Sequence, residues 1–279
     1  MQVVSLDFGG TLISCPAWMD LELRDLIRAV FVELKTLGWD GGEGQNKRAA
    51  ERWAAERWEA ERAESMLRDI RERARQTLRE YSAQECVREI FQRTGMAVPP
   101  PHLLEEVLGR LYRGLLPQVE WLPGSREFLY SLREAGLRLA LLSNAAYAPF
   151  VQWALEEAGV RHLFETVIVS DQTGWRKPHP RPFQELLRRL EVTPAVACHV
   201  GDHFEQDVVG ATRAGMRAIW LREPAAPGGP AAPGGLAAPG DFAGPGDTAL
   251  PHTTACGEGH LWTIAPDLHE AARLLLHAA

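Results

Sequence analysis

From residue 123 onward, the apolar positions of the chain alternate between two periods. Segments 125–136, 148–159 and 180–192 carry apolar residues every three or four positions, which predicts amphipathic helices. The short apolar runs LRLALLS, FETVIVS, AVACHVG and RAIWL lie between and after them and predict buried strands. Because alternation of helix and strand is typical of a parallel sheet covered by helices, we expect an α/β fold with a doubly wound, Rossmann-like sheet.

Residues 3 to 13, VVSLDFGGTLI, predict one more strand of this kind, and the pattern from there to about residue 120 is helical. Apolar spacing predicts a helix over 17–37, and the stretch 46–80, rich in Ala, Glu and Arg, predicts a long helix with a solvated charged face. SAQE at 82–85 has the form of a capping box that opens another helix. We therefore expect an all-helical cap domain, 14–121, inserted into a sheet domain made of residues 1–13 and 122–279.

A low-complexity stretch follows the last of the apolar runs. Residues 225–242 repeat as AAPGGP, AAPGGL and AAPGDF, and large apolar side chains stay scarce up to about Gly259. Such a composition cannot bury a core, so residues 223–259 are expected to form a flexible surface loop rich in Pro, Gly and Ala inside the sheet domain. The segments LWTI and DLHEAARLLLHA then predict a return to ordered structure.

Composition and charge narrow the possible partners. The 279 residues are 46% hydrophobic, and the formal net charge of −7 gives no reason to expect binding to nucleic acid or to an anionic membrane. No apolar run approaches the roughly 20 residues needed to span a bilayer, and no signal peptide pattern is present, so a cytoplasmic location is expected. The four cysteines are far apart and form no CxxC pair, which favours isolated reduced thiols.

Polar residues stand at the predicted ends of several strands. Asp7 follows the first strand, Ser143 ends LRLALLS, Lys177 lies in GWRKPHP after VIVS, and Asp202 and Asp207 follow AVACHVG. Taken singly, each of these residues has an ordinary interpretation as a cap or a solvated loop residue. Because the carboxyl ends of parallel strands meet at one edge of the sheet, together they indicate a site for phosphate and a divalent cation.

Four segments of the chain carry a resemblance to a known family: SLDFGGTL, PGSREFLYSLREAGLRLALLSN, SDQTGWRKPHPRPFQELLRRL and CHVGDHFEQDVVGATRAGM. In order and spacing they resemble the motifs of the haloacid dehalogenase superfamily, in the branch with a helical cap between the first and second motifs. The resemblance covers nearly all of the expected sheet domain. The expected cap resembles the family only in length and helicity.

The resemblance implies a phosphatase mechanism and assigns the residues to roles. Asp7 would attack phosphorus and form an aspartyl-phosphate, Ser143 would hydrogen-bond the transferring group, and Lys177 would neutralise its charge. Mg2+ would be bound by Asp7, Asp202 and the carbonyl of position 9, with Asp207 in support. The residues that would bind the substrate are Thr11, Ser143, Asn144 and Lys177.

Position 9 departs from the family pattern. The phosphatases of this family usually have a second Asp there, which protonates the leaving oxygen and later activates water, but this chain has Gly9. Its carbonyl can still bind a metal, whereas acid and base assistance worth roughly 10²- to 10⁴-fold is lost unless another group supplies it. A cap residue or an ordered water could replace the acid. Leaving groups that depart without a proton, such as acyl or phenolic phosphates, would suffer least.

The expected function is that of an Mg2+-dependent phosphatase acting on a small phosphorylated metabolite, as a monomer or a homodimer. The alternative is a catalytically weak or inactive protein that binds phosphate and regulates, because Gly9 removes the acid. A 2-haloacid dehalogenase and a phosphosugar mutase are less favoured, the first because Gly9 replaces an aromatic hydroxyl and the second because it depends on the missing acid. His179, His199 and His203 are interpreted as structural, although His203 could help to protonate a leaving group.

Overall fold

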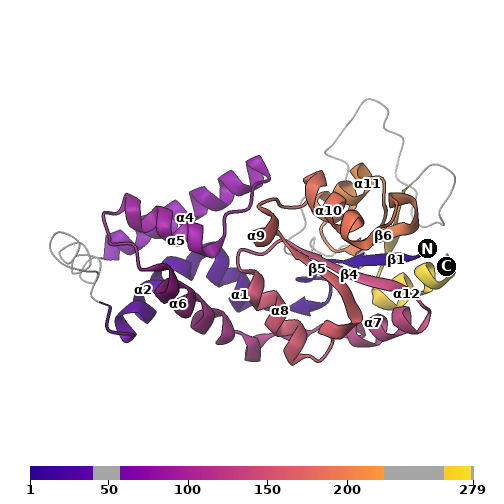
Figure 1. The fold of residues 1–279 in the computed structure, drawn as a ribbon, viewed down its shortest axis with the longest axis horizontal. Helices are drawn as coiled ribbons and strands as arrows, with labels where there is room; N and C mark the ends of the chain where they lie inside the picture. Colours follow the sequence, from indigo (N-terminus) through magenta and orange to yellow (C-terminus); the bar gives the residue numbers. More distant parts are fainter. Residues whose placement is uncertain (40–56, 223–260, 278–279) are drawn as a thin grey trace, which may run out of the picture.

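The computed structural model describes residues 1–39, 57–222 and 261–277. A six-stranded sheet lies in one half of the molecule (Figure 1). Its strand order is β5-β4-β1-β6-β7-β8, and every neighbouring pair of strands is parallel. The strands are β1 (Val3–Leu6), β4 (Arg138–Ser143), β5 (Phe164–Val169), β6 (Ala197–Gly201), β7 (Arg217–Leu221) and β8 (Trp262–Ala265). The expected doubly wound α/β fold is therefore confirmed, with β1 in the middle of the sheet.

Helices cover both faces of this sheet. One face packs against α7 (Ser125–Glu134), α8 (Ala148–Glu157) and α12 (Leu268–His277), and the other against α10 (Pro180–Leu190), the π-helix η5 (Phe204–Val209) and α11 (Gly210–Arg213). Successive side chains of β4 alternate between the two cores, with Leu139 and Leu141 in the first and Ala140 and Leu142 in the second. A strand that is buried on both faces has no solvent-exposed face for polar side chains, which explains the continuous apolar sequence of β4.

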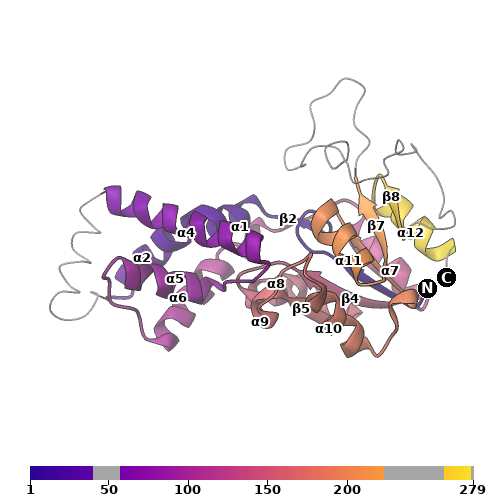
Figure 2. The same cartoon turned by 90° about the horizontal axis from the view of Figure 1, so that it is seen from above.

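A block of helices lies beside one end of the sheet and gives the molecule an elongated shape (Figure 2). It consists of α1 (Pro16–Asp20), the π-helix η1 (Leu21–Asp25), α2 (Leu26–Thr36), α4 (Arg57–Thr77), α5 (Ala83–Arg93) and α6 (Pro101–Arg113). The single helix predicted over 17–37 is thus broken by a π-helical stretch. The helix predicted over 46–80 ends at Thr77, and its residues 46–56 lie outside the described residues.

The capping box predicted at 82–85 is confirmed. Ser82 Oγ accepts a hydrogen bond from the Glu85 main-chain nitrogen at 3.1 Å, and the Glu85 carboxylate accepts one from the Ser82 nitrogen at 2.9 Å. These two bonds satisfy donors that the first turn of α5 would otherwise leave unpaired. The helix therefore begins where the sequence indicated.

The chain enters and leaves the helical block through two paired strands. β2 (Ile13–Ser14) pairs antiparallel with β3 (Glu120–Trp121), so the expectation of an all-helical stretch from residue 14 to about 120 was wrong at both ends. The pair holds the two connections side by side. The division into a sheet domain, 1–13 with 122–279, and a cap domain, 14–121, stays a prediction, and the expected loop 223–259 lies outside the described residues.

Three short segments complete the connections. They are the 3₁₀ turns η2 (Leu116–Gln118), η3 (Arg161–Leu163) and η4 (Pro194–Val196). In addition, the short helix α9 (Ser170–Thr173) follows β5.

Among the described residues, no helix combines the length and the apolar character that crossing a membrane requires.

Candidate active site

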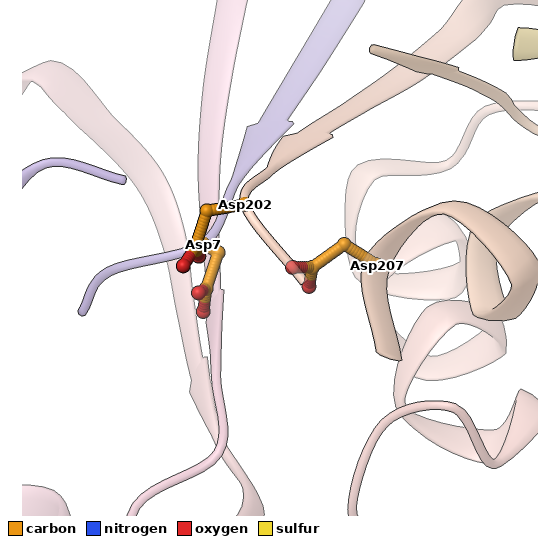
Figure 3. Close-up of side chains that lie close together, drawn as sticks. All are labelled: Asp7, Asp202 and Asp207. Atoms are coloured by element: carbon orange, nitrogen blue, oxygen red, sulfur yellow. The ribbon is translucent and has the colours of Figure 1, made fainter. Parts of the chain in front are cut away.

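Three carboxylates meet at the carboxyl end of the sheet. Oxygen atoms of Asp7, Asp202 and Asp207 all lie within 4.8 Å of one another (Figure 3). Asp7 follows β1 and Asp202 follows β6, and the two strands are neighbours, so their ends bring these side chains together. The Asp7 main-chain nitrogen donates to the Val200 carbonyl at 2.9 Å, which extends the pairing of β1 with β6 by one residue. Asp207 points toward the pair from η5.

Lys177 links two of these carboxylates. Its Nζ lies 2.7 Å from Asp7 Oδ1 and 2.6 Å from Asp207 Oδ1, and the residue is 2% exposed. Burial disfavours the charged amine, but the charges of Asp207 and Asp7 outweigh it and raise the pKa of Lys177. Lys177 is therefore a buried cation placed directly against Asp7.

The carboxylates carry more negative charge than one lysine can balance. Burial, together with the charges of Asp7 and Asp207, raises the pKa of Asp202 to about 7, and burial also raises the pKa of Asp7 despite Lys177. Asp207 differs: burial opposes its charge, yet Lys177 and a hydrogen bond from His199 hold its pKa well below the usual range. Hard oxygen donors crowded at 4.8 Å or less form a donor set that fits a divalent cation.

Asp207 is held by a chain of buried partners that the sequence analysis missed. His199 Nε2 lies 3.2 Å from Asp207 Oδ1, and His199 Nδ1 lies 2.7 Å from Ser5 Oγ. The His203 main-chain nitrogen donates to the other oxygen, Oδ2, at 2.9 Å. The signal in the sequence was a histidine inside an otherwise apolar strand. Burial lowers the pKa of the His199 imidazole, which favours its neutral form.

Asp202 is placed by the turn after β1. Thr11 Oγ1 donates to Asp202 Oδ1 at 3.2 Å. Gly10 has a φ of +80°, and a Cβ atom there would lie 2.3 Å from Asp202 Oδ2, so glycine is needed both for the backbone conformation and for the close approach. Thr11, expected to bind substrate, thus contacts Asp202 in this structure. Gly9 lies in the same turn, between Asp7 and Gly10.

Ser143 and Asn144, at the end of β4, have different surroundings. The Ser143 side chain is 2% exposed and makes no hydrogen bond within the described part of the chain. Asn144 Nδ2 donates to the Lys177 carbonyl at 3.0 Å and to Gln206 Oε1 at 2.7 Å, and Asn144 Oδ1 accepts from the Lys177 nitrogen at 2.8 Å. Asn144 therefore fixes the main chain of Lys177, and the Ser143 hydroxyl has no hydrogen-bond partner among the residues described.

The histidines near the site form no metal cluster in the ranges that the structure describes, where the carboxylate trio is the one group of potential ligands. His203 Nδ1 accepts from the Gln206 nitrogen at 3.4 Å and caps η5, and His179 Nδ1 accepts from the Arg181 nitrogen at 3.1 Å and caps α10. Cys15, Cys86 and Cys198 are buried and form no disulfide within the described residues, while Cys256 lies outside them.

Comparison with known proteins agrees with this geometry. The model of the haloacid dehalogenase-like hydrolases matches residues 1–215. A Bos taurus protein named haloacid dehalogenase-like hydrolase domain-containing protein 3 is 32% identical over 142 residues, 50% of this chain and 55% of its own. The glyceraldehyde 3-phosphate phosphatase of Methanothermobacter thermautotrophicus is 40% identical over 98 residues, 35% of this chain and 42% of its own.

Among solved structures, a phosphatase of this family from Thermococcus onnurineus superposes with a TM-score of 0.55 at 22% identity and covers 99% of this chain and 98% of its own. At that identity it shows the fold alone. The matched stretches span about half the length of the first curated relatives or less. The family model covers most of the sequence, and the fold and the order of the strand-end residues agree with it. The chain belongs to the family of haloacid dehalogenase-like hydrolases.

Proposed function

We propose that the protein is an Mg2+-dependent phosphatase that hydrolyses a small phosphorylated metabolite through an aspartyl-phosphate on Asp7. The observation that carries the proposal is the position of Lys177 Nζ, 2.7 Å from Asp7 and 2.6 Å from Asp207, next to Asp202. A carboxylate nucleophile must stay ionised in a buried site. A lysine at hydrogen-bond distance provides that stabilisation.

In the first step, an oxygen of Asp7 attacks phosphorus while the bond from phosphorus to the ester oxygen breaks. The ester oxygen leaves with the electron pair of that bond. Ser143 would donate its hydroxyl to a phosphoryl oxygen, and Lys177 would offset the charge of the transferring group. In the second step, water attacks phosphorus and the bond from phosphorus to the Asp7 oxygen breaks. The Asp7 carboxylate leaves with the electron pair of that bond, and the protons of water remain on the released inorganic phosphate or pass to solvent.

The residues present fit a divalent cation. Asp7 and Asp202 would hold Mg2+ together with the carbonyl of Gly9, because both acids offer oxygen ligands and Asp207 is already bonded to Lys177 and His203. When bound, Mg2+ supplies positive charge beside the phosphate. Lys177 alone leaves the site with excess negative charge, which would repel a phosphate.

The related proteins support the class of substrate. The archaeal relative's name states that it acts on glyceraldehyde 3-phosphate, a small phosphate ester. The second candidate function is that of a weak or inactive phosphate-binding protein, favoured by Gly9. A dehalogenase is less favoured because displacement of a halide needs no metal, whereas Asp7, Asp202 and Asp207 form a donor set that fits a divalent cation.

The test is phosphate release from p-nitrophenyl phosphate, acetyl phosphate and alkyl sugar phosphates, with Mg2+ or with EDTA. We expect turnover that requires Mg2+ and is lost in Asp7→Asn, while Asp20→Asn, at an exposed position, retains it. If Asp7→Asn and the original chain release phosphate at the same rate, the proposal is wrong. Binding of phosphate and Mg2+ without turnover would instead support the second candidate.

A further inference from the structure

The backbone conformation at position 9 does not require a glycine. Unlike Gly10, it has no positive φ, so residues with a side chain can adopt its conformation. Its neighbours set the limit: a Cβ atom at position 9 would lie 3.1 Å from Trp18 Cζ3 and 3.8 Å from Trp18 Cη2. The carboxyl group of an aspartate would extend beyond that Cβ and would need more space on the side where Trp18 lies. Trp18, from the helical block, occupies the region into which a side chain at position 9 would extend.

Trp18 is firmly packed in this place. It is 3% exposed, and its ring lies 5.0 Å from that of Phe150 and 6.1 Å from that of Phe8, measured between centroids. Phe8 lies in the turn after β1 and Phe150 on α8, so Trp18 is a residue of α1 that packs into the sheet domain. Interiors of this density leave little room for a ring to move aside.

A buried carboxylate anchors the indole. Trp18 Nε1 donates to Glu22 Oε1 at 2.8 Å, and the same carboxylate accepts from Tyr112 Oη at 3.3 Å and from the Ala146 nitrogen at 3.1 Å. Tyr112 belongs to α6, and Ala146 lies three residues after Ser143. Rotation of Trp18 away from Gly9 would leave Glu22 without one of its donors in a buried position, which is costly.

We propose that Trp18 takes the space of the acid missing at position 9 and thereby determines leaving-group specificity, so that the site prefers acyl and aryl phosphates over alkyl phosphates. The inference rests on the proposed function. An aspartate at position 9 could give the leaving oxygen a proton, whereas the carbon edge of an indole cannot. Esters whose oxygen departs as a stable anion do not need that proton, and alkyl esters do.

The catalytic test combines Gly9→Asp and Trp18→Phe, since the shorter phenyl ring withdraws the indole carbons from Gly9. Activity is measured with aryl phosphates of graded leaving-group pKa and with an alkyl phosphate. In the original chain, we expect kcat/KM to fall steeply as leaving-group pKa rises. Gly9→Asp alone should lower kcat/KM at least about 10-fold for all substrates. For the alkyl ester, kcat/KM of the variant that combines Gly9→Asp with Trp18→Phe should be about 10²-fold higher than kcat/KM of Trp18→Phe alone. Trp153→Phe, at an aromatic position that does not contact Gly9, is the control.

A second test does not depend on catalysis. Gly9→Ala should lower the melting temperature by roughly 2–4 °C in the original chain and by clearly less in the Trp18→Phe background, because the two sites compete for space. Equal shifts in both backgrounds, or faster hydrolysis of alkyl esters by Gly9→Asp alone, would overturn the inference. If no variant hydrolyses any ester but the melting shifts differ as expected, the competition for space between Trp18 and position 9 is supported. The proposed function then fails, together with the leaving-group preference that rests on it.

Discussion

Lys177 and Asp207 form an ion pair of 2.6 Å in which each side chain is 1% exposed. Asp207 also accepts hydrogen bonds from the His203 nitrogen and from His199, so both of its oxygens are bonded within the protein. Because both oxygens of Asp207 are already bonded, Asp207 would act on the proposed reaction by holding Lys177 against Asp7. Removing its charge should therefore affect both stability and activity.

Asp207→Asn should lower the free energy of unfolding by about 3–5 kcal/mol, because it leaves the buried Lys177 with one carboxylate in place of two. Urea unfolding measures the change. Glu72→Gln removes a carboxylate from the exposed pair with Arg75 and should have little effect. Stability of Asp207→Asn equal to that of the original chain would contradict this account of the pair.

Mg2+ should stabilise the fold and be required for turnover, because Asp7, Asp202 and Asp207 carry more negative charge than the adjacent Lys177 can offset. The melting temperature should rise with Mg2+, in line with about 2.7 kcal/mol of stabilisation at one hundred times the dissociation constant. Asp202→Asn should reduce that rise by about half or more at the same Mg2+ concentration, and the variant should need at least about tenfold more Mg2+ for half-maximal activity. An unchanged Mg2+ response in Asp202→Asn would show that the cation binds elsewhere.

Gly10→Ala should displace Asp202, since the added methyl would lie 2.3 Å from Asp202 Oδ2. Gly136→Ala is a matched control: its φ is also +80°, but a Cβ there meets nothing within 4 Å, so it adds backbone strain alone. Both variants should lose about 1 kcal/mol from strain, and only Gly10→Ala should lose the thermal shift with Mg2+. The measurement is the melting temperature of each variant with and without Mg2+. An equal rise with Mg2+ in Gly10→Ala and Gly136→Ala would contradict the prediction.

Asp171 should make stability depend on pH. Burial raises its pKa from 3.8 to about 6, although the Ala148 nitrogen donates to it at 2.8 Å. Between these values the folded chain binds the proton more tightly than the unfolded chain, so the contribution of Asp171 is most favourable below pH 3.8 and falls as the pH rises to about 6. Asp171→Asn keeps an acceptor for Ala148 and avoids the buried charge.

The Asn variant should thus be more stable than the original chain by roughly 2–3 kcal/mol at pH 7.5, with the difference vanishing near pH 4. Denaturant unfolding of both proteins across this range tests the expectation. A constant difference at all pH values would mean that the ionisation of Asp171 does not contribute.

The strand-end residues could be placed from the sequence because of a simple geometric rule. Apolar runs mark the parallel strands, and all parallel strands of one sheet end at the same edge, so Asp7, Ser143 and Asp202 had to approach one another. The alternation of elements fixed the fold class in the same way. These inferences depend on local pattern and chain direction, which a sequence displays directly.

Contacts between distant segments were decided only by the tertiary structure. Nothing in the sequence indicates that His199 reaches Asp207, that Glu22 bonds to Ala146 across 124 positions, or that the helix over 17–37 contains a π-helical stretch. The competition between Trp18 and a side chain at position 9 is of the same kind. A sequence shows which residues line one face of an element, but which atoms of two faces meet depends on packing in three dimensions, and here that packing determines the surroundings of Gly9.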